Sequence, residues 1–338
     1  MTGELKRRTG RSLPVETGVF VLLALLSGWL MWRFPQFRTG ANLDVVITTG
    51  AIYAIVAAGM TMVIATGGID ISVGSILGFA ATILLTLTGR YGWGLYAASC
   101  AALMCGIACG AANGILIAIL RVPPIVATLA TLSAARASAY IVAYLVGTES
   151  FAGRLPESFS NLYFGKWMGL PNSGWVGALA LISAAVILKR AAFGRSLLAL
   201  GGNRTTAFMS GLSVRRTELA VYMISGLLAA TAAIIVAARE GSVNPDAGKY
   251  LELSAITAVV VGGTPIAGGR ATVFGTLLGV LTISVVSNGV ISYGLTGLWQ
   301  PLVLGSVLLA TVEVDRWRMR RTARSADSQA TPKPMAAG

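Results

Sequence analysis

The residues of this chain that could do covalent or acid–base chemistry are few and poorly placed for it. The 338 residues include no histidine and only 13 carboxylates. Cys100, Cys105 and Cys109 lie in one apolar run, without a histidine or a nearby acid to complete a metal site. No Gly-x-x-x-x-Gly-Lys-Ser/Thr sequence is present to cradle a nucleotide. We therefore expect no catalytic residue, no metal site and no cofactor on this chain.

Two ionisable residues inside apolar stretches have other possible roles. Asp70 follows a Gly-Gly pair, and its carboxylate could cap the next helix or contact a solute; its placement favours the cap. Arg136 lies in the middle of an apolar run, where an unpaired cation costs at least a few kcal/mol. We expect Arg136 to pair with a backbone carbonyl or a carboxylate of a neighbouring helix, or to face a hydroxyl-rich solute.

The composition shows what surrounds these residues. Hydrophobic residues make up 55% of the chain and charged residues 12%, which is about half the charged share of a soluble domain. The formal net charge of +13 is gathered in clusters beside long apolar runs, as in membrane proteins. No nucleic-acid-binding motif accompanies these clusters, so nucleic acid is not an expected partner. The fold class is therefore an all-α polytopic integral membrane protein that contacts membrane lipid.

A helix needs about 20 apolar residues to cross a bilayer, and this length predicts about ten spans between a short N-terminal segment, 1–17, and a basic tail, 314–338. The tail has the composition of a disordered segment. The eighth span is short, so 251–269 is expected to be a broken or re-entrant helix inside protein. The predicted spans of the membrane domain 18–313 are 18–32, 43–66, 72–88, 93–119, 124–147, 173–188, 217–238, 252–263, 271–291 and 297–313.

Basic clusters assign the sides of the membrane. The segment before the first span, the segment 189–216 and the tail are rich in arginine and lysine. An even number of predicted spans separates each cluster from the next, so all three lie on one side, which the positive-inside rule makes the cytoplasm. Both termini are then cytoplasmic. The segments 148–172 and 239–251 face outward and are candidate docking surfaces.

Two glycine-rich stretches share a pattern. Residues 67–74 and 262–269 both read Gly-Gly-x-x-Ile-x-x-Gly, and each lies where one span ends and another begins. Interrupted helices of this kind meet near the translocation path of transporters built from structural repeats. Four matched positions also arise by chance in a chain with 41 glycines.

The segment 189–216 carries apolar residues on a predicted cytoplasmic loop. Asn203 is a good N-cap, and 205–210 is expected to form a short helix that Gly211 stops. Such a helix would project Ala207, Phe208 and Met209 away from the membrane. Exposed apolar groups normally have a partner, although the helix could instead lie flat on the membrane surface.

Three stretches, 66–75, 193–211 and 255–270, resemble the permease subunits of ATP-binding-cassette (ABC) importers, in the branch that serves ribose, xylose and related sugars. The resemblance covers about 43–313. Relatives with this pattern carry pentoses, hexoses, sugar alcohols or autoinducer-2, and the pattern does not distinguish these substrates. The expected function is import of a monosaccharide or sugar-like molecule; the alternative is an ion-gradient-driven secondary transporter, which would need no ATPase.

The resemblance also implies a location and a set of partners. The chain would lie in the bacterial cytoplasmic (inner) membrane, with a second permease chain, identical or homologous, and a periplasmic or extracellular sugar-binding protein outside. A separate ATPase, which holds ATP and Mg, would contact the segment 189–216, which corresponds to the coupling loop of this family. The family commonly has acidic residues after Gly-Gly-Asn where this chain has Arg204-Thr205-Thr206, so the charges of that contact are expected to differ. The coupling candidates are Gly201, Gly202, Asn203, Arg204, Ala207, Ser210 and Gly211.

Residues of the translocation path are predicted less sharply. Asp70, Ser72, Arg136 and Asn288 are the main candidates because they are polar or charged within or beside apolar spans. Aromatic and amide side chains would also suit a sugar, but tryptophan and tyrosine near span ends more often lie at the membrane interface. These weaker candidates are Gln300, Trp299, Tyr140, Tyr144 and Tyr293.

Overall fold

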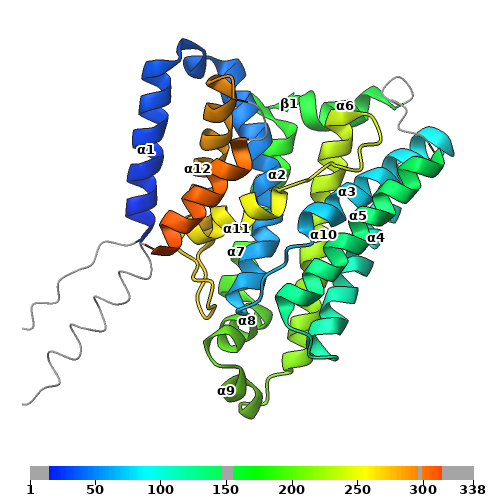
Figure 1. Cartoon of the computed structure of the whole chain (residues 1–338), viewed down its shortest axis with the longest axis vertical. Helices are drawn as coiled ribbons and strands as arrows, with labels where there is room; N and C mark the ends of the chain where they lie inside the picture. Colours follow the sequence, from blue (N-terminus) through cyan, green and yellow to red (C-terminus); the bar gives the residue numbers. More distant parts are fainter. Residues whose placement is uncertain (1–14, 147–154, 296–298, 314–338) are drawn as a thin grey trace, which may run out of the picture.

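The computed structural model describes residues 15–146, 155–295 and 299–313. Long apolar helices lie side by side, with short helices and loops at the two ends of the bundle (Figure 1). Among the described residues, eight helices are long and apolar enough to cross a membrane, and two further apolar helices are shorter. Each predicted span coincides with one of these ten helices, which confirms the all-α polytopic membrane fold. The tail 314–338 and most of 1–17 lie outside the described residues.

The helix boundaries agree with the predicted spans to within a few residues. The short elements are η1 (Pro35–Arg38), α6 (Glu157–Phe164), α8 (Ala192–Gly202), α9 (Arg204–Met209), α11 (Leu251–Val261) and a two-stranded antiparallel hairpin, β1 (Lys166–Trp167) and β2 (Leu170–Pro171). The long helices are α1 (Val15–Arg33), α2 (Gly40–Ala65), α3 (Val73–Leu85, continued by the π-helical turn η2, Thr86–Arg90), α4 (Leu95–Ala118), α5 (Pro124–Val146), α7 (Asn172–Arg190), α10 (Val214–Glu240) and α12 (Val273–Ser292). The unlabelled last helix is Trp299–Glu313.

The core is built around α2 and α10. Every residue of α2 from Gly50 to Ala65 is buried. α10 packs tightly along α4 because glycines let the two backbones approach: a Cβ at Gly110 would overlap backbone atoms of Tyr222 and Met223. In contrast, α1, α4, α5 and α7 expose large apolar side chains on their outer faces. These outer helices therefore present the surface that faces lipid.

The two glycine-rich breaks have the same backbone structure and touch each other. After α2, Gly67 adopts φ +81°, and Gly68 N donates to Val63 O; after α11, Gly263 adopts φ +91°, and Thr264 N donates to Val259 O. This is the Schellman turn that ends many helices. In the structure Gly67 is therefore equivalent to Gly263, whereas the shared sequence pattern aligns Gly67 with Gly262. Gly269 N donates to Ala65 O at 3.0 Å, which joins the two breaks.

The predicted interruption at 251–269 is confirmed. α11 has 11 residues, which gives a length of about 16 Å, too short to cross a bilayer. It lies at mid-height in the bundle (Figure 1) and eight of its residues are buried. A helix that ends at such a depth is tolerated because protein surrounds its free backbone groups.

The two ends of the bundle carry different elements. α8 and α9 lie at the lower end in Figure 1; the start of α1 and the end of Trp299–Glu313 point toward that end but lie at about the height of α11. The hairpin and α6 lie at the upper end, where Lys166 Nζ pairs with Asp44 Oδ2 at 2.5 Å. The start of α1 and the end of Trp299–Glu313 are thus directed toward the end that carries α8 and α9; that all three basic segments lie on one side of the membrane stays a prediction.

Candidate functional site

The segment 189–216 is helical rather than a loop with a single short helix. α7 continues to Arg190, and α8 follows it directly. Leu197 and Leu200, three residues apart, are buried, so α8 follows the helical period by packing one apolar edge on the bundle. This helix was missed because its other face is exposed and its last two residues are glycines. The prediction of a long loop here was wrong.

The short helix after Asn203 forms as predicted. Asn203 Oδ1 accepts a hydrogen bond from Thr206 N at 2.9 Å, which makes Asn203 the N-cap of α9. The helix ends at Met209, Ser210 is its C-cap, and Gly211 adopts φ +80°. A left-handed glycine at this place is a common helix stop.

α9 presents two of its three central apolar residues. Phe208 is 71% exposed and Met209 is 81% exposed, whereas Ala207 is buried with 4% exposure. The expectation that Ala207 projects outward was therefore wrong: it packs inward and holds α9 in place. Arg204 also anchors α9, because its guanidinium makes a two-pronged ion pair with the buried Glu218 on α10.

Gly201 ties α8 to both glycine-rich breaks. A Cβ at this position would overlap Ala65 O and lie 2.5 Å from Gly269 N, so the backbones of three segments meet there. A Cβ at the adjacent Gly202 would meet no atom of the described residues within 4 Å. The end of α8 is thus seated on the end of α2 and on the segment before α12, and only the first glycine of the pair is required by packing.

Asp70 and Ser72 belong to a fully buried network. Asp70 Oδ1 accepts hydrogen bonds from Ser72 N at 3.0 Å and Ser72 Oγ at 2.5 Å, and Oδ2 accepts one from Ser225 Oγ on α10 at 2.8 Å. Asn113 on α4 donates to Ser72 Oγ at 2.8 Å. The N-cap of α3 is Ser72, so Asp70 does not itself cap this helix. It orders the break from two residues earlier and ties it to α10.

Arg136 and Asn288 also pair with protein groups. The Arg136 guanidinium donates to Pro245 O and, at 2.9 Å, to Ala247 O. Of the partners expected for Arg136, the structure therefore shows backbone carbonyls. Asn288 Nδ2 donates to Asn42 Oδ1 at 3.0 Å and joins α12 to α2. The structure brings Asp70 and Ser72 together and leaves Arg136 and Asn288 in separate contacts.

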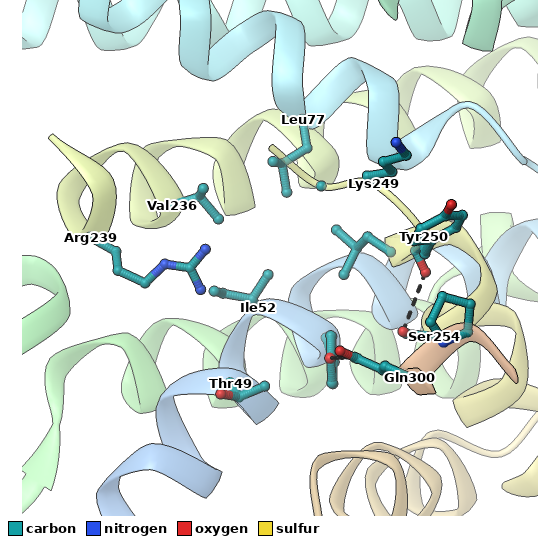
Figure 2. Close-up of a pocket in the computed structure, with 13 residues that line it drawn as sticks. Thr49, Ile52, Leu77, Val236, Arg239, Lys249, Tyr250, Ser254 and Gln300 are labelled. Atoms are coloured by element: carbon teal, nitrogen blue, oxygen red, sulfur yellow. Dashed lines mark hydrogen bonds between the residues drawn. The ribbon is translucent and has the colours of Figure 1, made fainter. Parts of the chain in front are cut away.

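A cavity of about 250 Å³ lies between α2, α3, α10, α11 and Trp299–Glu313 (Figure 2). None of the four main path candidates lines it. Of the weaker candidates, Gln300 lines the cavity. The polar residues contributed by α2 and by the segment before α11 were not predicted, because their local sequence does not distinguish them from residues that only pack against other helices. The polar and charged side chains around the cavity are Thr49, Tyr53, Arg239, Lys249, Tyr250, Ser254 and Gln300.

One wall of the cavity carries a hydrogen-bond network. Gln300 Nε2 donates to Tyr53 OH at 3.0 Å and to Ser287 Oγ at 3.2 Å. Tyr53 OH and Ser287 Oγ are 3.4 Å apart. Residues of three helices therefore hold the Gln300 amide and the Tyr53 phenol in fixed orientations.

Comparison with known proteins agrees with this architecture. Residues 42–312 match the family described as branched-chain amino acid transport system / permease component. The chain is 36% identical over 299 residues to the ribose import permease protein RbsC of Escherichia coli K12, covering 88% of this chain and 91% of that protein, and equally so to RbsC of Bacillus subtilis. It is 31% identical over 312 residues to the fructose import permease protein FrcC of Rhizobium meliloti, covering 90% and 86%.

No solved structure matches the chain. The family match spans nearly all of the predicted membrane domain, and the relatives align over most of their own length. This agreement confirms the resemblance to ABC importer permeases that the glycine-rich stretches and the Gly-Gly-Asn segment indicate. The chain belongs to the family of branched-chain amino acid transport system permease components.

Proposed function

We propose that this chain is the membrane-spanning permease subunit of an ABC importer that carries a monosaccharide or sugar-like molecule into the cytoplasm. The relatives named as ribose and fructose import permeases support this substrate class. As a permease component the chain needs no catalytic residue, because ATP and Mg are held by a separate ATPase subunit. Its place is the bacterial cytoplasmic membrane.

The exposed face of α9 is the observation that carries the coupling role. A capped helix at the end of the bundle holds Phe208 and Met209 out in solvent, and apolar groups so exposed favour a protein partner. Through Gly201, the adjoining α8 contacts the ends of two interrupted segments. Movement of an ATPase against α9 would therefore shift α8, and with it the ends of α2 and of the break before α12.

The remaining partners follow from the two-ended arrangement. With α8 and α9 in the cytoplasm, the segment 239–251 and the described part of 148–172, which contains α6 and the hairpin, face outward, where a sugar-binding protein docks. A second permease chain completes the pathway. Asp70, Ser72 and Asn288 serve this pathway by fixing its helices, since their polar atoms are engaged with protein groups.

The test is co-purification with partner subunits from native membranes in mild detergent. Phe208→Glu places a charge on the α9 surface without touching the packing of Ala207. We expect a stoichiometric ATPase with the wild-type chain and its loss with Phe208→Glu. The matched control is Phe164→Glu, because Phe164 is 64% exposed on α6 at the other end, and this variant should keep the ATPase.

One outcome would contradict the proposal. A wild-type preparation that contains no ATPase, but transports solute into liposomes under an ion gradient, would make the chain a secondary transporter. In that case Phe208→Glu should leave transport unchanged.

A further inference from the structure

The cavity of Figure 2 has the size and the two-sided chemistry of a site for one sugar. Its volume of about 250 Å³ lies just below the range of roughly 300–1,000 Å³ typical of drug-sized ligands. Leu77 and Val236 lie on one side together with Lys249, Thr49 and Gln300 lie on the opposite side, and Arg239 points in from α10 (Figure 2). A monosaccharide has apolar C–H faces and an edge of hydroxyl groups, so both sides have a counterpart.

The polar side retains hydrogen-bonding capacity. Gln300 uses its amide N–H groups on Tyr53 and Ser287; within the described chain no hydrogen bond reaches its Oε1. Tyr53 OH accepts from Gln300 and shares a 3.4 Å hydrogen bond with Ser287 Oγ in which either hydroxyl can donate, so its proton is free for a sugar when Ser287 is the donor. The hydroxyl of Thr49 also has no hydrogen bond among the described residues. Acceptor and donor thus stand side by side, as recognition of sugar hydroxyls requires.

The charges around the cavity are balanced. Arg239 Nη2 lies 2.7 Å from Glu240 Oε1, and Lys249 Nζ lies 3.8 Å from Asp246 Oδ1. Because each cation has its own carboxylate, the cavity offers no unpaired positive charge to a phosphate or a sugar acid. A neutral polyhydroxylated ligand is therefore the better fit.

The segment before α11 forms the wall of the cavity next to α3. Gly248 and Tyr250 both line the cavity and both have left-handed backbones, with φ +74° and +66°. A left-handed conformation is costly for tyrosine and persists only where the surroundings impose it. Arg136 supplies part of that restraint by binding the carbonyls of Pro245 and Ala247. The wall is held in place from α5, outside the cavity.

We propose that this cavity is a sugar-binding site within the permease, where Gln300, Tyr53 and Thr49 bind the hydroxyl groups of one neutral monosaccharide during its transport. This assignment rests on the proposed import function. It gives the permease a sugar-recognition step of its own, in addition to that of the soluble binding protein.

The experiment uses the complete transporter, with its ATPase and binding protein, in proteoliposomes. The probes are radiolabelled D-ribose, D-xylose and D-fructose, each compared with a deoxy analogue. The variants are Gln300→Leu, Tyr53→Phe and Thr49→Val; the last removes a hydroxyl without breaking any hydrogen bond that the structure shows. The matched control is Tyr293→Phe, because Tyr293 OH pairs with Trp29 Nε1 at 3.3 Å, away from the cavity.

Each variant should lower transport of the accepted sugar by roughly two- to tenfold, the effect of one lost hydrogen bond. For Thr49→Val, which breaks no hydrogen bond that the structure shows, membrane abundance and binding-protein-stimulated ATP hydrolysis should stay within twofold of the wild type. The preference for the sugar over its deoxy analogue should shrink, and since all preparations share one binding protein, its own selectivity cancels. Tyr293→Phe should change none of these quantities.

The failures are distinguishable. If the wild-type transporter carries none of the three sugars, the proposed substrate class fails, and the sugar site fails with it. If the wild type transports a sugar but the three variants keep its selectivity, the cavity is not a sugar site, although the import function stands. A parallel fall of transport, ATP hydrolysis and abundance would also overturn the proposal, because it would show a purely structural role.

Discussion

Several polar residues within the bundle hold one helix to another. Asp70 joins the break after α2 to Ser225, Arg136 joins α5 to the segment before α11, and Asn288 joins α12 to α2. Inside a bilayer the alternative to such a bond is an unsatisfied group in hydrocarbon, which is expensive. Polar side chains of this kind therefore fix the relative positions of the helices.

Asp70 offers the sharpest test at this scale. Asp70→Ala leaves Ser72 N and Ser225 Oγ without their partner, and each buried unsatisfied group costs about 1–3 kcal/mol. Asp70→Asn keeps one acceptor oxygen for Ser72, and its amide can donate to the Ser225 hydroxyl. We expect Asp70→Ala to lower the thermal stability of the purified protein clearly, and Asp70→Asn to retain most stability and transport.

The same pair of variants separates a structural from a direct role. If Asp70→Asn abolishes transport while membrane abundance and thermal stability stay normal, Asp70 contacts the solute or a gate. The measurements are the midpoint of thermal unfolding in detergent and uptake of labelled sugar at matched expression.

The sequence identified these residues but not their partners. An unpaired cation or carboxylate in an apolar run has a high free-energy cost, so the sequence predicts that Asp70 and Arg136 each have a hydrogen-bonding or charged partner. Their partners Ser225 and Pro245 are 155 and 109 residues away along the chain, and no local pattern marks either one. The cavity was missed for the same reason, since its lining comes from five separate segments.

At the scale of elements, the contact between α8 and the two glycine-rich breaks is the feature most open to a test. Gly201→Ala forces a methyl group into Ala65 O and Gly269 N, whereas the Cβ of Gly202→Ala enters open space. Overpacking of this kind costs about 1–3 kcal/mol, while an exposed change usually stays within about 0.5 kcal/mol. We expect Gly201→Ala to reduce the sugar transported per ATP hydrolysed and to lower thermal stability, and Gly202→Ala to do neither.

The two variants differ by one position and have the same chemistry, so helix propensity does not explain a difference between them. Equal behaviour of the two would show that α8 is not seated on the breaks in the working transporter. The measurement is the ratio of sugar uptake to phosphate release in proteoliposomes, with unfolding of the purified complex as the second readout.

Local signals predicted some elements well and others poorly. Asn203 and Gly211 carry strong capping chemistry, and the helix between them formed where expected. The short apolar run before Gly262 correctly predicted an interrupted span. α8 was missed because it is amphipathic at a membrane surface, and Ala207 was placed on the wrong side because a six-residue helix has too few positions to define a buried face. The structural alignment of the two breaks differs by one residue from the sequence alignment, because the equivalent positions are set by where each helix ends and not by identical residue types.

For the whole molecule, α2 connects the two proposed sites. Tyr53 on the cavity and Ala65 at the seat of α8 lie on this one buried helix, 12 residues or about 18 Å apart. A closely packed interior transmits strain, so a displacement at one end of a buried helix is felt along it. If the two proposed sites hold, displacement of its lower end by α8 would change the cavity and would link ATP hydrolysis to sugar release over a short distance.

This route requires α9 to be cytoplasmic and α6 to be outside, and labelling tests that orientation. In a chain whose three cysteines are replaced by serine, Ser210→Cys and Ser158→Cys each place one thiol on an exposed residue at opposite ends. A membrane-impermeant maleimide should label Ser158→Cys in intact spheroplasts and Ser210→Cys only in inverted vesicles. The reverse pattern would refute the orientation, and labelling of both from one side would refute the separation of α6 from α9. Because the permease is expressed without its ATPase, protection by that partner does not affect the result.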